Sequence, residues 1–557
     1  MPLPNAFIVG IIEGIGEKME DLKLKSQSIP GARKKQAEVG RYYRRTLLNA
    51  IGIDDKEFNK PLVAVVNGWN EISPGNFHLR PVAEAVKQGI LEAGGHPAEF
   101  GALGLCDGLS VGSIADRYSL PYRDATALYL ESMLEANLFD AAVFIPTCDK
   151  VVPAFLMAAV KVNIPSIFVT GGYMEPGCFE DKAVVMSDIV EAFGAVESNQ
   201  MSDSDFNRLL NSACPGPGTC PLMATGNTVA SMAEALGMSL PGNTTTPAMS
   251  SALLKYARAS GRQIMSLLEK DIRPTRIIIR GAIENAMRVI LSIGGSTNML
   301  LHIGAVAFLA GHPIELERWE QLSQDTPLVI KIKPSGSEKT MVDFARAGGI
   351  PAVMKSLESK LDTEVLTVTG SPLAETLSNV EWTNQEEVRP MDNPYASEGG
   401  LAILKGNLAQ EGAIVKQSAV PDDMRLFEGP AAVFDSEEEA IEGLMEGQIT
   451  DGQVVIIRYE GPKGGPGMRQ LQFFMNILCG MGRQSKVALV TDGRFSGTNW
   501  GLFVGHLCPE AVEGGNIALI KDGDTIRIDI DKREVNLLVD KKELKKRKEG
   551  WRSPTVK

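Results

Sequence analysis

Between about residues 60 and 370, short apolar runs alternate with segments of helical periodicity, and this alternation restricts the fold more than any other feature. The runs PLVAVVN (61–67), AAVFIP (141–146) and IPSIFVTGG (164–172) are typical of buried strands. Amphipathic helices are expected between them, over residues 80–95 and 123–137. Strands that are apolar throughout and are separated by helices predict a parallel sheet with both faces covered.

The texture of the chain changes at about residues 372–395, where the sequence becomes polar, contains prolines and loses its periodicity. A domain boundary is expected there. Beyond it, short apolar runs alternate with turns rich in Gly, Asp and Pro, in AAVFD (431–435), QVVIIRYEG (453–461), KVALVTDG (486–493) and NIALIKDGDTIRIDID (516–531). We therefore predict an α/β protein with a parallel-sheet α/β domain over residues 1–375 and a β-rich, barrel-like domain over residues 390–557.

Charge and cysteine content exclude several classes of protein. The net charge of −13 argues against nucleic acid or an anionic membrane as the main partner, and the one sustained basic run, KKELKKRK (541–548), is expected to be a solvated tail. Seven scattered cysteines do not make a disulfide framework, so a reducing, cytoplasmic setting is expected. No apolar run is long enough to span a bilayer. The first 21 residues lack the pattern of a signal or transit peptide and are expected to pack on the body as an arm or helix.

Polar loops follow several of the predicted strands. NEISPGNFHL (70–79) connects the first predicted strand to the first helix, an arrangement typical of a site at the carboxyl end of a parallel strand. Four further loops contain glycine beside a few polar residues: GLCDGLSVG (104–112), PTCDKVVP (146–153), RYEGPKGGPGM (458–468) and TDGRFSGTNWG (491–501). Each loop alone is compatible with a purely structural turn.

Taken together, these loops contain three acids without an obvious local partner, Asp107, Asp149 and Glu460. Mg²⁺ prefers oxygen ligands of this kind, so we predict a divalent-metal site near the domain junction. Lys150 is either an ordinary ion-pair lysine or, if it is carbamylated, a carboxylate-like ligand. Ser496 has no histidine close by in the sequence, which argues against a Ser-His-Asp triad, but a metal that lowers its pKa would allow it to act as a base.

The cysteines of these loops have no zinc-like spacing. Cys148 and Cys220 lie in no CxxC pair, and residues 214–220 form a C-x5-C pattern. The residues alone therefore favour buried apolar cysteines over a metal cluster.

A series of longer strings resembles the dihydroxy-acid dehydratase and sugar-acid dehydratase family, in the order of that family from about residue 40 to 540. The strings are WNEISPGNFHL, DGLSVG, RYSLPYRD, CDKVVPAFLMAA, CPGPGTCPLMATGNT, GGSTN, RPMDNPY, GGLAILKGNLAQEGAIVK, EGPKGGPGM, TDGRFSG and GHLCPEA. CDK, GGSTN and GPKGGPGM in this order are very specific. The resemblance implies an active site between the two domains, an iron–sulfur cluster with [2Fe–2S] favoured, Mg²⁺ beside it, and a homodimer or homotetramer.

Roles are carried over only to matching positions. The positions that look like the Mg²⁺ ligands are Asp107, Asp149, Lys150 (carbamylated or not) and Glu460. Those that look like cluster ligands are Cys148 and Cys220, and Ser496 looks like the base that takes the proton from C2. The implied reaction is a hydro-lyase step that converts 2,3-dihydroxy-3-methylbutanoate to 3-methyl-2-oxobutanoate in branched-chain amino-acid biosynthesis. Two alternatives stay open, an aldonic-acid dehydratase and a non-catalytic homologue that binds a metal or an acid.

The sequence departs from the family at Gly75. Members of the family usually carry a cysteine there, which is the remaining cluster ligand, and glycine has no donor atom. Three alternatives follow: Cys106 or Cys178 replaces the ligand, the cluster is held by two protein thiolates, or the cluster is absent.

The choice of substrate is also open. NEISP, GPKGGPGM and DGRFSG look like the branched-chain enzyme, whereas EAGGHPAEF, TVASMAEALGMSLPG and SIGGSTN look closer to the sugar-acid dehydratases.

Overall fold

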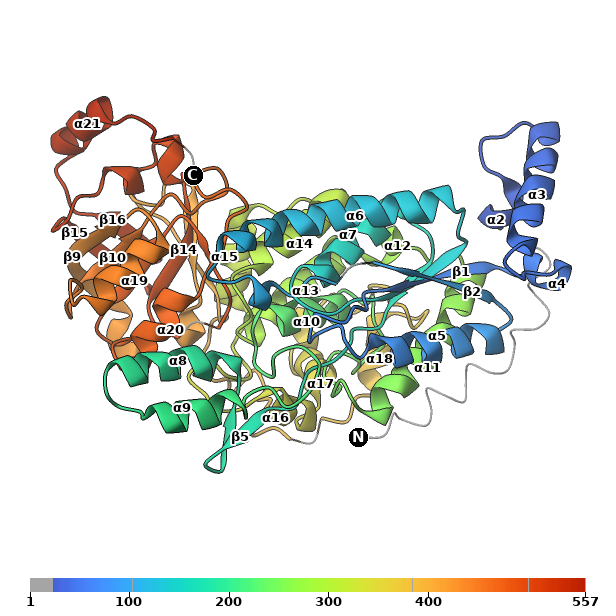
Figure 1. The fold of residues 1–557 in the computed structure, drawn as a ribbon, viewed down its shortest axis with the longest axis horizontal. Helices are drawn as coiled ribbons and strands as arrows, with labels where there is room; N and C mark the ends of the chain where they lie inside the picture. Colours follow the sequence, from blue (N-terminus) through green and yellow to red (C-terminus); the bar gives the residue numbers. More distant parts are fainter. Residues whose placement is uncertain (1–23, 103, 383, 499, 556–557) are drawn as a thin grey trace.

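The computed structural model describes residues 24–102, 104–382, 384–498 and 500–555, so the predicted amino-terminal arm (1–21) lies outside the described residues. Figure 1 shows an elongated molecule with small helices at one end and a barrel-like region at the other. The small helices are α2 (Lys25–Ser28), α3 (Lys34–Asn49) and α4 (Asp55–Phe58). Among the described residues, no helix is both long enough and apolar enough to cross a membrane.

The amino-terminal region is built on a four-stranded sheet in the order β2–β1–β3–β4, in which every neighbouring pair is parallel. The strands are β1 (Leu62–Asn67), β2 (His96–Gly101), β3 (Ala141–Ile145) and β4 (Ser166–Phe168). The connecting helices are α5 (Leu79–Glu92), α6 (Ser119–Ala136) and α7 (Val151–Val162). Strands β1 and β3 are buried at every position, which explains why their sequences are apolar without interruption. The predicted alternation of strands and helices is confirmed.

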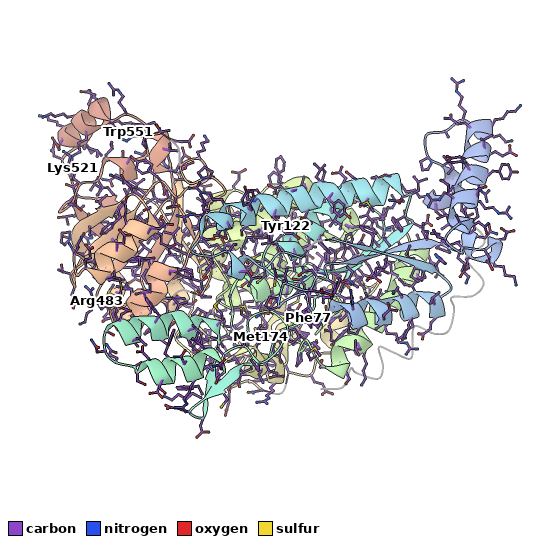
Figure 2. All side chains as sticks on the ribbon, viewed as in Figure 1. Phe77, Tyr122, Met174, Arg483, Lys521 and Trp551 are labelled. Atoms are coloured by element: carbon purple, nitrogen blue, oxygen red, sulfur yellow. The ribbon has the colours of Figure 1, made fainter. Side chains whose placement is uncertain are left out.

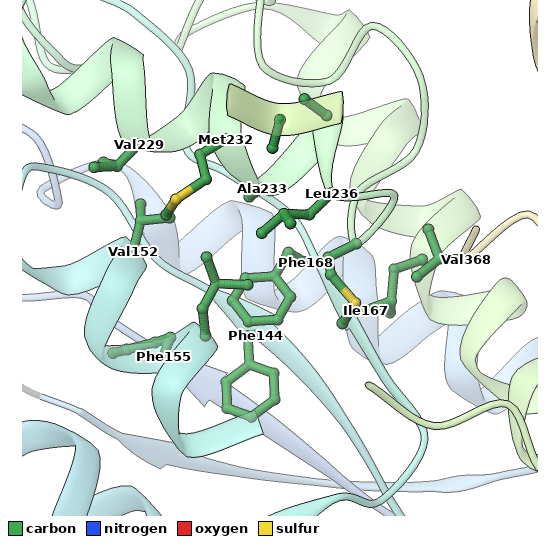
Figure 3. Packing of buried hydrophobic residues seen from close by; sticks show 14 of the residues in the cluster. Phe144, Val152, Phe155, Ile167, Phe168, Val229, Met232, Ala233, Leu236 and Val368 are labelled. Atoms are coloured by element: carbon green, nitrogen blue, oxygen red, sulfur yellow. The ribbon is translucent and has the colours of Figure 1, made fainter. Parts of the chain in front are cut away.

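Aromatic side chains fill the space between this sheet and its helices (Figure 3). Phe144 of β3 stacks on Phe168 of β4, with ring centroids 4.9 Å apart, and meets Phe155 of α7 edge-on at 5.9 Å. Met232 and Leu236 come from α10 (Thr225–Ala235) and the residue that follows it, and they are fully buried in the same cluster. The sheet and its helices therefore share one continuous core.

The further helices of the amino-terminal region surround the core, except that α8 (Met186–Glu197) and α9 (Asp203–Leu210) form a separate small cluster in which α8 packs against α20 (Phe473–Gly480) of the carboxyl-terminal region. The others are α11 (Ser251–Glu269), α12 (Pro274–Ile277), α13 (Arg280–Ser292), α14 (Met299–Leu309), α15 (Leu316–Asp325), α16 (Met341–Arg346), α17 (Gly349–Ser356) and α18 (Leu373–Ser378). A small hairpin of β5 (Gly177–Phe179) and β6 (Lys182–Val184) projects from the amino-terminal region, below α8 and α9 in the view of Figure 1.

The carboxyl-terminal region contains an eight-stranded mixed sheet in the order β16–β15–β9–β10–β12–β14–β8–β7. Its strands are β7 (Ala402–Leu404), β8 (Gly412–Val415), β9 (Leu426–Phe434), β10 (Val454–Ile457), β12 (Ala488–Thr491), β14 (Phe503–Cys508), β15 (Thr525–Asp529) and β16 (Glu534–Leu537). The four strands β9, β10, β12 and β14 are parallel to one another. A bridge between Lys405 and Glu534 joins the two edges, so the sheet is nearly closed, and the predicted barrel-like fold is confirmed.

The remaining elements of this region are α19 (Glu437–Met445), β11 (Gln470–Leu471), α20 (Phe473–Gly480), β13 (Arg494–Phe495) and α21 (Lys541–Gly550). The basic run 541–548 lies in α21, which buries none of its residues. One predicted strand is wrong: Asn516–Leu519 forms a short 3-10 helix, with Ile517 and Leu519 buried. A short apolar run cannot by itself distinguish a buried strand from a buried helical turn.

Candidate functional site

The loops that follow the four parallel strands of the amino-terminal sheet meet at one edge of it. Gly75 lies in the loop after β1, Asp107 follows β2, and Cys148 follows β3. The loops after β1 and β4 are joined by His78, whose Nε2 lies 2.6 Å from the carbonyl oxygen of Gly171. The carboxyl ends of parallel strands lie at the same edge of a sheet, which is the usual place for a ligand site in such folds.

Cys148 has a strained backbone. Its φ of +73° is in the left-handed region, which a residue with a side chain rarely adopts and which costs about 1–3 kcal/mol. The residue is buried between β3 and α7, and its thiol lies against the loop after β1. A Cβ atom built on Gly75 would lie 2.1 Å from the Cys148 sulfur. The surrounding loops therefore hold this thiol in a tightly packed position.

Asp107, Asp149 and Lys150 form one buried ionic cluster. The Lys150 Nζ donates to Asp107 Oδ2 at 2.6 Å and lies 3.5 Å from Asp149 Oδ2. Burial raises the pKa of Asp107, but Lys150 and Arg494 outweigh it and lower this pKa below its usual value. Burial, together with the charge of Asp107, raises the pKa of Asp149 to about 7. Two carboxylates thus compete for one ammonium, and a divalent cation would stabilise both.

The other two predicted residues lie in the carboxyl-terminal region, one after a strand of the barrel-like sheet and the other after a strand of a separate two-stranded sheet. Glu460 follows β10, and its backbone N–H donates to Asp492 Oδ1 at 3.0 Å. Its carboxylate pairs with Arg469, at 3.0 Å between Nη2 and Oε1. Ser496 follows β13, which pairs in parallel with β11 so that Arg494 lies opposite Gln470. Glu460 and Ser496 therefore belong to two adjacent loops.

Side chains of the amino-terminal region position the loop that carries Ser496. Thr225 donates from Oγ1 to the Ser496 carbonyl oxygen at 3.0 Å, and Asn298 donates from Nδ2 to the Phe495 carbonyl oxygen at 2.7 Å. The Ser496 hydroxyl itself lies 2.7 Å from Thr498 Oγ1. Asn298 is the last residue of the GGSTN motif, so this motif helps to hold the serine loop in place.

The two regions also meet directly at the acids. Gln470 donates from Nε2 to Asp107 Oδ2 at 2.5 Å, and its backbone N–H donates to Asp116 Oδ2 at 2.6 Å. The amino-terminal region supplies both aspartates, and the carboxyl-terminal region supplies Gln470. The junction between the two regions therefore passes through the ionic cluster. Figure 2 shows Phe77 and Tyr122, from the loop after β1 and from α6, in the central part of the molecule.

The structure thus brings most of the predicted residues together. Asp107, Asp149, Lys150 and Cys148 share one cluster. Glu460 is linked to it indirectly, through its ion pair with Arg469, the neighbour of Gln470. Ser496 is linked to it through Thr225, and a Cβ built on the neighbouring Gly226 would lie 3.2 Å from Asp149 Oδ1. Cys220 lies close enough to Cys106 and Asp149 for both to raise its pKa, after the larger effect of burial. Cys178, by contrast, is exposed on the β5–β6 hairpin.

Whether the implied cofactors fit can be judged from the donors present. The oxygen donors of Asp107, Asp149 and Glu460 suit Mg²⁺, and the thiols of Cys148, Cys220 and Cys106 suit an iron–sulfur cluster. Within the described part of the chain, no three His, Cys, Asp or Glu side chains already stand in a ready-made metal-binding arrangement. The Lys150 ammonium lies among the acids instead, so the donor set fits Mg²⁺ once this positive charge is removed.

Two residues of the site were not predicted. Arg494 is fully buried, and its charge helps to lower the pKa of Asp107 and limits the rise in the pKa of Asp149. Its position in the GRFSG string, directly after a strand, was the available signal. Gln470 bonds to Asp107 although 363 residues separate them in the chain, and no local pattern marks it.

Comparison with known proteins gives a consistent result. Residues 60–376 match the family model described as dihydroxy-acid/6-phosphogluconate dehydratase N-terminal, and residues 386–557 match the corresponding C-terminal model. A dihydroxy-acid dehydratase of Moorella thermoacetica is 46% identical over 521 residues, which is 93% of this chain and 94% of that protein. A dihydroxy-acid dehydratase of Pyrococcus abyssi is 45% identical over 521 residues, with the same coverage. A third, of Methanosarcina barkeri, is 46% identical over 514 residues, covering 92% of this chain and 93% of that protein.

Proposed function

The chain belongs to the dihydroxy-acid/6-phosphogluconate dehydratase family, and from this premise we propose that it is the hydro-lyase that converts 2,3-dihydroxy-3-methylbutanoate to 3-methyl-2-oxobutanoate. The names of its relatives support a dihydroxy-acid substrate, and the reaction that we propose belongs to branched-chain amino-acid biosynthesis. Loss of water gives an enol, which tautomerises to the 2-keto acid without net oxidation or reduction.

The observation that carries this proposal is the direct contact between the two regions at the buried aspartates. Asp107 and Asp149 come from the parallel-sheet region, and Gln470, which follows Glu460 by ten residues, reaches Asp107 from the barrel-like region. Removing a weakly acidic proton next to a carboxylate requires stabilisation of the negative charge that develops. A buried site with several charged groups already in place can give this stabilisation without reorganisation of water.

We assign the Mg²⁺ donors to Asp107, Asp149, Glu460 and Lys150. A bound Mg²⁺ would stabilise the negative charge that develops on the substrate, and an iron–sulfur cluster would supply a Lewis acid for loss of the hydroxyl group. Lys150 is completely buried and donates to Asp107, so it would have to lose its positive charge before a cation could bind. Carbamylation does this and adds a carboxylate in the same position.

Ser496 is the residue that takes the proton from C2. Its hydroxyl lies 2.7 Å from that of Thr498, and Thr225 and Asn298 fix the backbone carbonyls of Ser496 and Phe495. A base held in this way keeps its orientation while the substrate binds, which lowers the entropic part of the barrier. Ser496 is also largely buried, so little water competes with the substrate for it.

The experiment that tests this proposal measures keto-acid formation. The protein would be purified anaerobically, reconstituted with iron, sulfide and Mg²⁺, and incubated with 2,3-dihydroxy-3-methylbutanoate or with an aldonic acid. We expect 3-methyl-2-oxobutanoate from the first substrate. Product from an aldonate alone would transfer the assignment to a sugar-acid dehydratase, and no turnover of either would indicate a non-catalytic binding protein.

We also propose that the chain acts as a homo-oligomer in the cytoplasm. Helix α3 buries none of its residues, and exposes Val39, Tyr42, Tyr43 and Leu47 at helical spacing. A second copy of the chain is the partner that we expect to cover them. Light scattering after size exclusion would report the mass, and replacement of Tyr43 and Leu47 by glutamate should give monomers.

The cysteines are consistent with the proposed cytoplasmic location. All seven are free thiols, as is usual for proteins of a reducing compartment.

A further inference from the structure

Position 75 cannot hold a side chain while Cys148 keeps its place. The Cβ of any residue at 75 would lie 2.1 Å from the Cys148 sulfur and 3.5 Å from Cγ2 of Thr147. The backbone of Gly75 is not in the left-handed region, so its conformation does not require glycine. The Cys148 thiol therefore occupies the space that a side chain at position 75 would need. With the loops arranged in this way, residue 75 cannot supply a side-chain ligand to the cluster.

Cys106 is the second cysteine next to this thiol. It precedes Asp107 directly, in the loop after β2, whereas Cys148 follows β3, and these two strands flank β1. The two loops are tied together by Lys150, two residues after Cys148, whose Nζ lies 2.6 Å from Asp107 Oδ2, and the two thiols form a hydrogen bond with each other. The loops after the two outer strands thus bring a pair of thiols together next to the loop after β1.

The loop that carries Cys220 packs against the same place. The Gly218 backbone N–H donates to the Pro74 carbonyl oxygen at 3.1 Å, and Thr219 lines one small cavity together with Cys148. Cys220 therefore belongs to a loop that contacts both the loop after β1 and the loop after β3. Iron binds thiols as thiolates, so its binding would release their protons.

We propose that Cys106 supplies the third protein thiolate of the iron–sulfur cluster, together with Cys148 and Cys220 and in place of a ligand at position 75. This inference rests on the proposed function, because the cluster serves the same dehydration site. Cys178 does not compete for this role, since it is exposed on the β5–β6 hairpin. Cys214 is also exposed and belongs to the loop that leads to Cys220.

The test compares the cluster content of four anaerobically reconstituted full-length proteins: the wild type, Cys106→Ser, Cys214→Ser and the matched control Cys178→Ser. Iron and acid-labile sulfide per chain would be determined after desalting with a chelator, and the reduced clusters compared by electron paramagnetic resonance. Circular dichroism of each apoprotein would check the fold. Serine has nearly the shape of cysteine, so we expect Cys106→Ser to fold.

We expect Cys106→Ser alone to lose iron and sulfide, since even loss of an outer partner of a metal ligand costs roughly 10- to 100-fold in metal affinity. If serine still binds the iron, the resonance spectrum should shift, because oxygen replaces sulfur. Unchanged content and an unchanged spectrum in Cys106→Ser would overturn the inference, as would a loss confined to Cys214→Ser. A wild-type protein that holds no cluster at all would instead contradict the proposed function.

Discussion

The Nε2 atom of Gln470 lies 2.5 Å from Oδ2 of Asp107, and this hydrogen bond joins the barrel-like region to the ionic cluster of the parallel-sheet region. Lys150 donates to the same carboxylate oxygen, at 2.6 Å. Asp107 therefore receives hydrogen bonds from both regions. The orientation of Asp107, a proposed metal ligand, therefore depends on how the two regions are positioned relative to each other.

Replacement of Gln470 by leucine should lower kcat/KM while leaving the fold intact. The change removes a donor to a buried carboxylate, a loss of about 1.5–3 kcal/mol, or roughly 10- to 150-fold in rate if the bond is maintained in the transition state. The backbone bond from residue 470 to Asp116 is kept. The measurement is steady-state turnover at several Mg²⁺ concentrations. Gln448→Leu, at an exposed position in the same region, serves as the control, and an equal effect of both variants would contradict the role of Gln470.

Replacement of Ser496 by alanine should abolish most of the turnover without loss of cofactors. A positioned base contributes roughly 10²–10⁴-fold to rate, so kcat should fall by that factor. Iron and Mg²⁺ content should remain that of the wild type. Thr498→Ser is the matched control, because it keeps a hydroxyl group at the position that contacts Ser496. A Ser496→Ala protein with nearly normal kcat would exclude this residue as the base.

The α/β class of the amino-terminal region could be predicted because its strands are apolar at every position. β1 and β3 are completely buried, so no polar residue interrupts the pattern that distinguishes them from the amphipathic helices. The acids of the site were also predictable, since Asp107, Asp149 and Glu460 all follow strands directly. In each case the signal is local in the sequence.

The contacts that could not be predicted are those between distant segments. Gln470 bonds to Asp107 across 363 residues, and Gly75 lies against the Cys148 thiol although α5, β2, α6 and β3 separate them in the chain. Such pairs depend on the twist and packing of whole elements, which no short pattern encodes. The same limit explains the missed 3-10 helix at Asn516–Leu519, whose apolar residues are buried by tertiary packing.

Lys416 provides a test of stability against pH. It is fully buried, its Nζ donates to the Met223 carbonyl oxygen at 3.3 Å, and burial lowers its pKa from 10.5 to about 7. Between these two values the unfolded chain holds a proton that the folded chain has released, so the stability contributed by this group rises with pH. Below pH 7 both states are protonated, and the buried ammonium is most destabilising.

Replacement of Lys416 by methionine should therefore raise the melting temperature most at about pH 6.5, and progressively less towards pH 9.5. The full effect on the free energy of unfolding is on the order of 3–5 kcal/mol. Differential scanning calorimetry of both proteins at several pH values would measure it. A difference between them that does not change with pH would show that Lys416 keeps an ordinary pKa in the folded protein.

Truncation of an aromatic side chain in the core should lower the free energy of unfolding strongly. Phe144 is fully buried between Phe168 and Phe155, so Phe144→Ala should destabilise the protein by about 3–5 kcal/mol. Phe308 of α14 is 70% exposed, and Phe308→Ala should cost much less. Denaturant unfolding followed by circular dichroism would compare the two. Similar midpoints for both variants would contradict the packing in Figure 3.

The measurement that tests the central claim most directly is the number of Mg²⁺ ions that the cluster-loaded protein binds. The protein would first be treated with bicarbonate to carbamylate Lys150, and isothermal titration calorimetry would then measure Mg²⁺ binding. If acids from both regions hold a single ion, the wild type should bind one Mg²⁺ per chain in this site. Asp149→Asn in one region and Glu460→Gln in the other should then both lose that same ion. Undiminished Mg²⁺ binding by Glu460→Gln, with binding lost only in Asp149→Asn, would show that the two regions do not form a common metal site.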